Sequence, residues 1–223
     1  MDYPEPKHLL DDEERAIVRV IRRRPAVASG FTLIELIVTI TLLGILVALG
    51  LPTFTAWIRN SQVRTVAEAL QNGLRTAQTE AVRRNQDVVM SFTNDANPQL
   101  NPNMVANGRN WSLQTVGSAF VGDGAAEFIK SGVLADVASG VTITISPLST
   151  DGAICFNSSG RLATNTAPTG LPSTATCTGT AKTFNIAQTN ADRPLRVTVA
   201  VGGQVRMCDP QRPALSSTSP DGC

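Results

Sequence analysis

An apolar run near the amino terminus constrains this chain more than any other feature. From Phe31 to Leu51 only one of 21 residues carries a charge, and that residue is Glu35. An α-helix of about 20 apolar residues crosses the roughly 30 Å hydrocarbon layer of a bilayer. Because a carboxylate inside such a segment is costly to insert, an ionisable residue there indicates a function. We therefore expect a single-pass anchor in which Glu35 has a specific role.

The residues before the apolar run predict its orientation. Three consecutive arginines, residues 22–24, precede it, and positive residues favour the cytoplasmic side of a membrane. A secretory signal peptide would instead place small residues and its cleavage site after the apolar region. We expect the residues after the run to lie outside the cytoplasm, where disulfides are stable.

The helical pattern continues beyond the apolar run. Pro52 lacks a backbone N–H and bends a helix, and apolar residues then recur at spacings of three and four from Phe54 to Ala81. We expect one kinked helix, with residues 31–52 in the membrane or a filament core and residues 53–86 as an amphipathic continuation that packs under a sheet.

After Asn85 the period changes to two, which predicts strands. The expected strands are Val88–Phe92, Trp111–Val116, Glu127–Lys130, Val141–Ser146, Ala153–Phe156, Thr183–Ala187 and Leu195–Met207, the last broken into a hairpin at Gly202-Gly203. A long helix followed by an antiparallel sheet is an α+β arrangement. The predicted β-rich domain is residues 87–223.

The cysteine pattern favours disulfides over a metal site. Cys155, Cys177, Cys208 and Cys223 form no CxxC pair, and the single histidine, His8, precedes the apolar run. Four cysteines allow three pairings. We favour Cys155–Cys177, which closes a Thr/Pro-rich loop, with Cys208–Cys223, which fastens a polar tail. Neither a metal nor another cofactor is expected.

The sequence does not predict an enzyme. It contains no hydrolase elbow, P-loop, zinc-binding helix motif or dinucleotide fingerprint. Residues 31–223 contain no histidine, which removes the commonest general base. The same residues carry thirteen Lys/Arg and twelve Asp/Glu, so no global field attracts nucleic acid or anionic lipid.

The motif Gly30-Phe31-Thr32-Leu33-Ile34-Glu35 resembles the processing site of type IV pilins and type II secretion pseudopilins. The resemblance implies that residues 1–30 are a leader, that a prepilin peptidase cuts between Gly30 and Phe31, and that the new amine of Phe31 is methylated. It also implies that Glu35 pairs with the amine of a neighbouring subunit during filament assembly. Such a pair in a low-dielectric core gives register more than net stability.

Two further stretches are similar to minor subunits of the GspH/FimT type. They are Ile154-Cys155-Phe156-Asn157-Ser158-Ser159-Gly160-Arg161 and Arg206-Met207-Cys208-Asp209-Pro210. The resemblance implies a minor pilin or pseudopilin, a structural subunit in the assembly or tip of a type IV pilus or type II secretion pseudopilus. It implies a bacterial inner-membrane anchor, a periplasmic domain, and other minor and major pilins or pseudopilins as partners.

A DNA-uptake receptor at a pilus tip is the alternative function. Some FimT-type proteins contact DNA phosphates through a Gly-Arg-x-Arg turn. Here Gln204 follows Gly203, so only Arg206 matches that turn, and Arg193, Arg196 and Arg212 are the other arginines that could form a local patch. A few phosphate contacts give weak, salt-dependent binding, and a solvated surface role for Arg206 is favoured over DNA contact.

Overall fold

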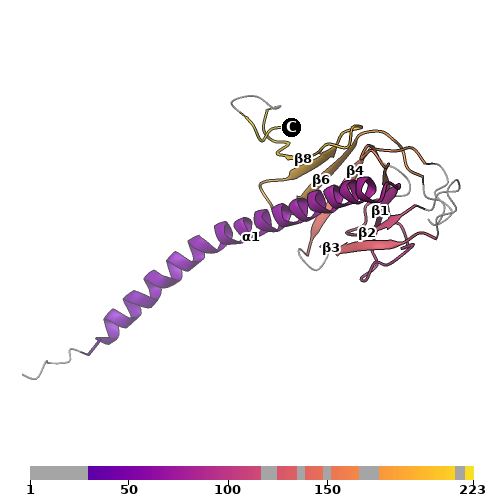
Figure 1. Cartoon of the computed structure of the whole chain (residues 1–223). Helices are drawn as coiled ribbons and strands as arrows, with labels where there is room; N and C mark the ends of the chain where they lie inside the picture. Colours follow the sequence, from indigo (N-terminus) through magenta and orange to yellow (C-terminus); the bar gives the residue numbers. More distant parts are fainter. Residues whose placement is uncertain (1–29, 117–124, 135–138, 148–151, 166–175, 214–218) are drawn as a thin grey trace, which may run out of the picture. The chain divides into compact units, whose positions relative to one another are not determined.

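The computed structural model describes residues 30–116, 125–134, 139–147, 152–165, 176–213 and 219–223. A single long helix, α1 (Leu33–Arg84), is followed within these residues by eight strands (Figure 1). The chain divides into two compact units, residues 1–48 and 49–223, and α1 contributes to both. The expected leader lies outside the described residues, apart from Gly30.

All strand pairs are antiparallel, and they form two sheets of four strands each. The first sheet has the strand order β3-β2-β1-β5, and the second sheet has the order β4-β6-β7-β8. The strands are β1 (Val88–Thr93), β2 (Asn110–Thr115), β3 (Phe128–Val133), β4 (Val141–Ser146), β5 (Ala153–Phe156), β6 (Lys182–Gln188), β7 (Leu195–Val199) and β8 (Val205–Cys208). The α+β class is confirmed, but the strands form two sheets where one was expected. Strand periodicity in the sequence carries no information about which strands pair.

The helix is continuous where a bend was expected. The assigned α-helix runs through residue 52 without a break, so a kink there stays a prediction. Its carboxyl end is a Schellman motif, in which the N–H groups of Gln86 and Asn85 donate to the carbonyls of Ala81 and Val82. Asn85 adopts the left-handed conformation that this motif requires, with φ of 53°.

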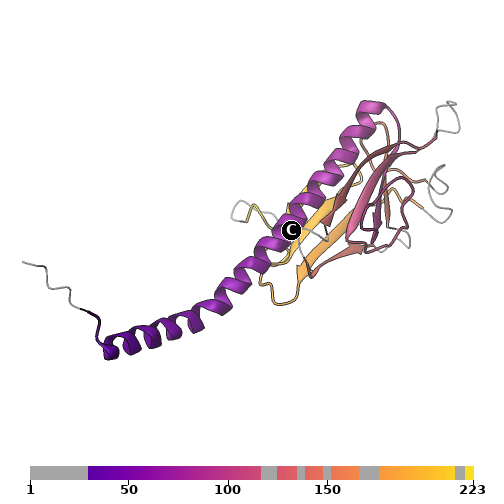
Figure 2. The same ribbon diagram turned by 90° about the horizontal axis from the view of Figure 1, so that it is seen from below.

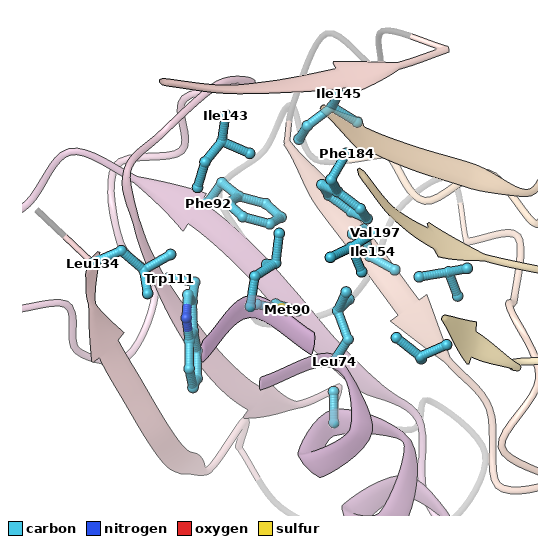
Figure 3. Packing of buried hydrophobic residues seen from close by; sticks show 14 of the residues in the cluster. Leu74, Met90, Phe92, Trp111, Leu134, Ile143, Ile145, Ile154, Phe184 and Val197 are labelled. Carbon is cyan, nitrogen blue, oxygen red and sulfur yellow. The ribbon is translucent and has the colours of Figure 1, made fainter. Parts of the chain in front are cut away.

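The second half of α1 and both sheets share one core (Figures 2 and 3). Helix side chains on one face are fully buried at spacings of one, three and four residues. They are Val63, Val66, Ala67, Leu70, Leu74, Ala77 and Ala81. Between the sheets, the ring of Phe92 on β1 lies 5.6 Å from that of Phe184 on β6, centroid to centroid.

The amphipathic stripe expected from the sequence is wrong at its start. Phe54, Trp57 and Ile58 fit the helical spacing, yet they are 59%, 65% and 38% exposed. The buried face begins only at Val63. The helix therefore enters the core about two and a half turns later than its sequence pattern indicates.

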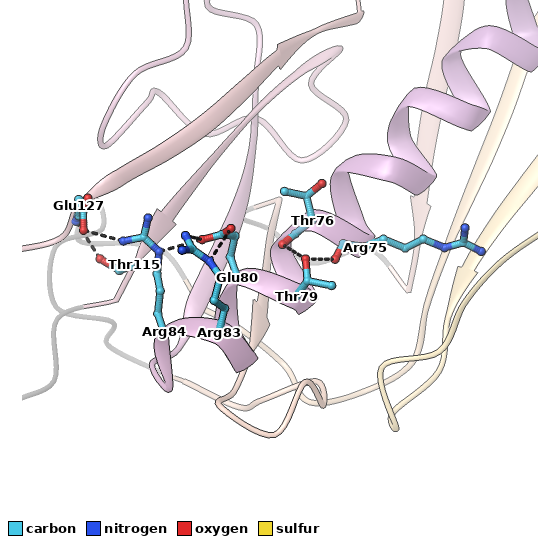
Figure 4. Close-up of polar contacts among 8 residues, drawn as sticks. All are labelled: Arg75, Thr76, Thr79, Glu80, Arg83, Arg84, Thr115 and Glu127. Carbon is cyan, nitrogen blue, oxygen red and sulfur yellow. Dashed lines mark hydrogen bonds and ion pairs between the residues drawn. The ribbon is translucent and has the colours of Figure 1, made fainter.

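An arginine joins the end of α1 to the first sheet (Figure 4). Arg84 Nε lies 2.9 Å from Glu80 Oε2, and Arg84 Nη1 lies 2.6 Å from Glu127 Oε2 beside β3. Hydrogen bonds from Arg83 and then Arg84 lower the pKa of Glu80. The helix terminus is thus held by both its backbone cap and a bridging cation.

Trp111 fills the space between α1 and the first sheet. Its indole lies against Gly73 of the helix and over Gly132, its register partner on β3. A Cβ placed on Gly73 would lie 2.8 Å from Trp111 Cζ2, and one placed on Gly132 would be closer still to the ring. Both glycines are therefore required by packing and not by backbone conformation.

We expect Gly132→Ala to lower the free energy of unfolding by about 1–3 kcal/mol, since overpacking a dense core costs that much. Gly202→Ala is the matched control, because a Cβ on Gly202 meets nothing within 4 Å. It should change stability by less than about 0.5 kcal/mol. Urea unfolding of the full chain in detergent, followed by fluorescence, measures both. Equal stability of the two variants would contradict this packing.

Candidate functional site

The residues of the predicted processing motif lie at the start of α1. Gly30 and Phe31 precede the helix, and Thr32 Oγ1 accepts a hydrogen bond from the Glu35 N–H at 3.2 Å. Thr32 is therefore the N-cap, and a threonine followed three residues later by glutamate is a capping-box pattern. Among the described residues no group forms a hydrogen bond or ion pair with the Glu35 carboxylate. This charge is free for a partner outside the chain.

The apolar side chains of residues 31–51 are exposed on every side of the helix. Each large one is between 47% and 81% accessible, from Ile37 to Phe31. By length and composition, α1 is the one helix among the described residues that could cross a membrane. A helix that is apolar all round needs lipid or neighbouring helices around it.

Two disulfides hold the carboxyl-terminal third of the chain. Cys155 on β5 is bonded to Cys177, and Cys208 at the end of β8 is bonded to Cys223. This is the pairing that the enclosed loops favoured. Next to the second disulfide, Asp209 and Gly222 form a parallel β-bridge. The chain end is thereby fastened beside the second sheet.

A groove of about 940 Å³ lies between α1 and this fastened end. Asn60 of α1 connects the helix to the β6–β7 loop at this groove, since its Oδ1 accepts hydrogen bonds from the N–H groups of Asp192 at 2.9 Å and Arg193 at 3.1 Å. The lining contains both apolar and charged side chains. It includes Trp57, Leu195 and Met207, with the charged residues Arg64, Arg193, Arg212, Asp192, Asp209 and Asp221.

The predicted arginines fall into two pairs. Arg193 and Arg212 line the groove, where three arginines face three aspartates, so the lining charges balance. Arg212 Nε lies 3.6 Å from Asp209 Oδ2, and Arg212 Nη1 lies 3.5 Å from Asp221 Oδ2. The lining of this part of the predicted patch therefore has no net charge, and Arg212 is paired within it.

The other two arginines lie on the outer face of the second sheet. Thr198 is opposite Arg206 in the β7–β8 register, and Arg196 is opposite Asn185, whose Oδ1 accepts from Arg196 Nε at 2.8 Å. The alternate residues Val197, Val199 and Val205 are buried. Arg196 and Arg206 consequently share a hydroxyl-rich surface with the exposed threonines of β4.

Comparison with known families identifies the globular part. Residues 66–203, more than half of the chain, match the family described as type II transport protein GspH. The chain belongs to the GspH family. Residues 26–51 match the prokaryotic N-terminal methylation motif, so the family expected from the sequence is confirmed at both stretches.

Relatives of this GspH-family chain include a fimbrial protein of Pseudomonas aeruginosa, 37% identical over 66 residues. That match covers 29% of this chain and 42% of the relative, so the chain spans less than half the length of the curated relatives it matches. The fold resembles the type IV minor pilin FimU of P. aeruginosa, with 17% identity, 66% and 97% coverage of the two chains and a TM-score of 0.43. It also resembles the minor pseudopilin EpsH of Vibrio cholerae, with 15% identity, 68% and 99% coverage and a TM-score of 0.43.

Sequence reasoning missed the cap at Thr32 and the groove of this GspH-family chain. The cap had a signal, the Thr-x-x-Glu spacing, which the processing motif overlaps. The groove had none, because Asn60 and Asp192 are 132 residues apart and meet only in the folded chain. Such a contact between distant polar residues has no local sequence signature.

Proposed function

We propose that this chain is a minor subunit of a type IV pilus or of a type II secretion pseudopilus. It is made as a precursor, anchored by residues 31–52 in the bacterial inner membrane with its β-rich domain in the periplasm. A prepilin peptidase removes residues 1–30 and the amine of Phe31 is methylated. The chain then leaves the bilayer for a filament of major and minor pilin-like subunits.

The observation that carries this proposal is the unburied apolar start of α1. Its large side chains are all at least 47% exposed in residues 31–51. Full burial of one such side chain is worth about 1.5–3 kcal/mol. A lipid bilayer or a bundle of identical helices supplies that burial, and movement between the two exchanges one apolar environment for another.

Glu35 supplies what an ordinary anchor lacks. The described part of the chain offers its carboxylate no ionic partner, and desolvating an unpaired carboxylate is costly. Cleavage before Phe31 creates a positive amine four residues before Glu35, about one helical turn away. Pairing of that amine in one subunit with Glu35 of the next would give each buried charge a counter-charge and would set the axial register between subunits.

The names of the relatives support both a type IV pilus and a type II secretion pseudopilus as the filament. The family name refers to type II transport, one structural neighbour is a pseudopilin, and the curated relatives are fimbrial proteins. Both machines would use the same chemistry of this chain: an apolar helix that packs in a filament core and a charged pair that fixes its position.

We expect Glu35→Gln to be processed normally but to enter filaments at least tenfold less, because the neighbouring amine then lacks a counter-charge. Glu68→Gln is the matched control on the same helix, since Glu68 is exposed and pairs locally with Arg64 at 2.8 Å. Immunoblots of sheared filaments and of membranes measure incorporation and processing. Equal incorporation of Glu35→Gln and the unaltered chain would refute the pairing role.

DNA is a second candidate ligand, favoured by one observation. Arg196 and Arg206 lie on the same outer sheet face, and Arg206 has no ionic partner in the described residues. Guanidinium groups beside hydroxyls suit phosphate oxygens. With two arginines the affinity would be weak and strongly dependent on salt.

If DNA is a ligand, a gel shift with the full chain in detergent appears at low salt and weakens as salt rises. The double variant Arg196→Gln with Arg206→Gln should abolish it, whereas Arg83→Gln should leave it unchanged, because Arg83 pairs with Glu80 on the helix. Absence of a shift at low salt would exclude this function. So would a shift that the double variant retains.

A further inference from the structure

An exposed pair of aromatic rings lies on α1 directly after the apolar run. Phe54 and Trp57 are 59% and 65% exposed, and their ring centroids lie 6.0 Å apart in a stacked arrangement. The neighbouring Ile58 is also exposed. Contiguous apolar side chains on a surface mark a site where another molecule binds. The position of this aromatic pair indicates which molecule that is.

The aromatic pair points away from the domain against which its own helix packs. An α-helix turns by about 100° per residue. Relative to the buried face of residues 63–70, Phe54 therefore points about 170° away and Trp57 about 130° away. Trp57 is part of the groove lining but stays mostly exposed there. The described part of the domain thus leaves both rings to a partner outside the chain.

The distance from the apolar run places the pair at the depth of lipid headgroups. A helix rises 1.5 Å per residue, so Phe54 lies about 4.5 Å and Trp57 about 9 Å beyond Leu51 along the axis. The interfacial layer on each side of the hydrocarbon core is about 5–8 Å thick. Both rings therefore fall within this layer or at its outer edge, where the rings of tryptophan and tyrosine are enriched in membrane proteins.

The order of residue types along the helix agrees with this depth. Residues 36–58 carry no charge, and Arg59 is the first charged residue after Glu35. Apolar residues, an aromatic pair and a cation thus follow one another in the order in which a bilayer presents hydrocarbon, interface and phosphate. A contact with another protein subunit would not require this order, so it favours lipid as the partner.

We propose that Phe54 and Trp57 insert into the headgroup layer of the periplasmic leaflet and fix the depth of α1 in the membrane before assembly. This inference rests on the membrane anchoring in the proposed function and adds the partner of the turns that follow the apolar run. The phenyl ring and the indole contact the glycerol and upper acyl region, and the indole N–H donates to lipid oxygens. Arg59 donates to lipid phosphates.

The test uses the fluorescence of the full chain in phosphatidylcholine vesicles. The chain contains two tryptophans, and the second, Trp111, is only 4% exposed within the core. Lipids brominated near the glycerol end of their acyl chains should quench Trp57 at least twofold more strongly than lipids brominated near the terminal methyl group. Trp57→Phe should abolish quenching by both lipids, because Trp111 contacts neither.

A matched variant moves the exposed indole to the other end of α1. Val82 is 53% exposed and lies in the last turn of the helix. Trp57→Phe combined with Val82→Trp should give an emission that the aqueous quencher acrylamide reduces and that brominated lipids leave unchanged. This comparison separates the depth of residue 57 from the mere exposure of an indole on the same helix.

Flotation of the vesicles shows separately whether the chain is anchored. A chain that floats but shows no lipid quenching of Trp57, or stronger quenching by the deeper bromines, would overturn this inference and leave the proposed function standing. A chain that does not float would overturn both. Shielding of Trp57 from acrylamide and from both brominated lipids would overturn the inference in favour of a second copy of the chain that covers the ring.

Discussion

The contacts available to the large side chains of α1 determine the rest of this structure. At its start the helix is apolar on every side and none of that surface is buried within the chain. From Val63 onward only one face is apolar, and that face completes the core of both sheets. The first half of α1 therefore needs other molecules around it, whereas the second half packs into the core of its own domain.

The second half of α1 is fixed to both sheets by side-chain contacts. Arg84 holds the carboxyl end of α1 to the first sheet, Asn60 holds an earlier turn to the second sheet, and Trp111 fills the space between helix and strands. These contacts come from elements distant in sequence. Displacing the second half of α1 along its axis would break these contacts together.

The same construction leaves the surface of the domain free for other contacts. Two disulfides and the Asp209–Gly222 bridge fix the carboxyl-terminal third without using the outer face of the second sheet. The groove charges are balanced within the groove itself. Glu35 on the helix and Arg206 on the sheet face are two of the charged residues that lack an ionic partner in the described residues.

The sequence predicted the elements of this fold better than their arrangement. Helix and strands were predictable because they follow from periods of 3.6 and two, which each residue reports locally. The division into two sheets was not, since it depends on which strand edges pair. Phe54 and Trp57 were misassigned because helical spacing does not reveal where a partner surface begins. At the site, the Gly30–Phe31 junction and Glu35 are local motifs, whereas the groove requires residues brought together from far apart.

Mass spectrometry of the chain recovered from sheared filaments of cells that contain the prepilin peptidase tests the central claim most directly. The claim is that the apolar start of α1 leaves the membrane as a processed filament subunit. The account predicts an amino-terminal peptide that begins at Phe31 and carries one added methyl group. Recovery of the chain only in the membrane fraction, with residues 1–30 still attached, would contradict it.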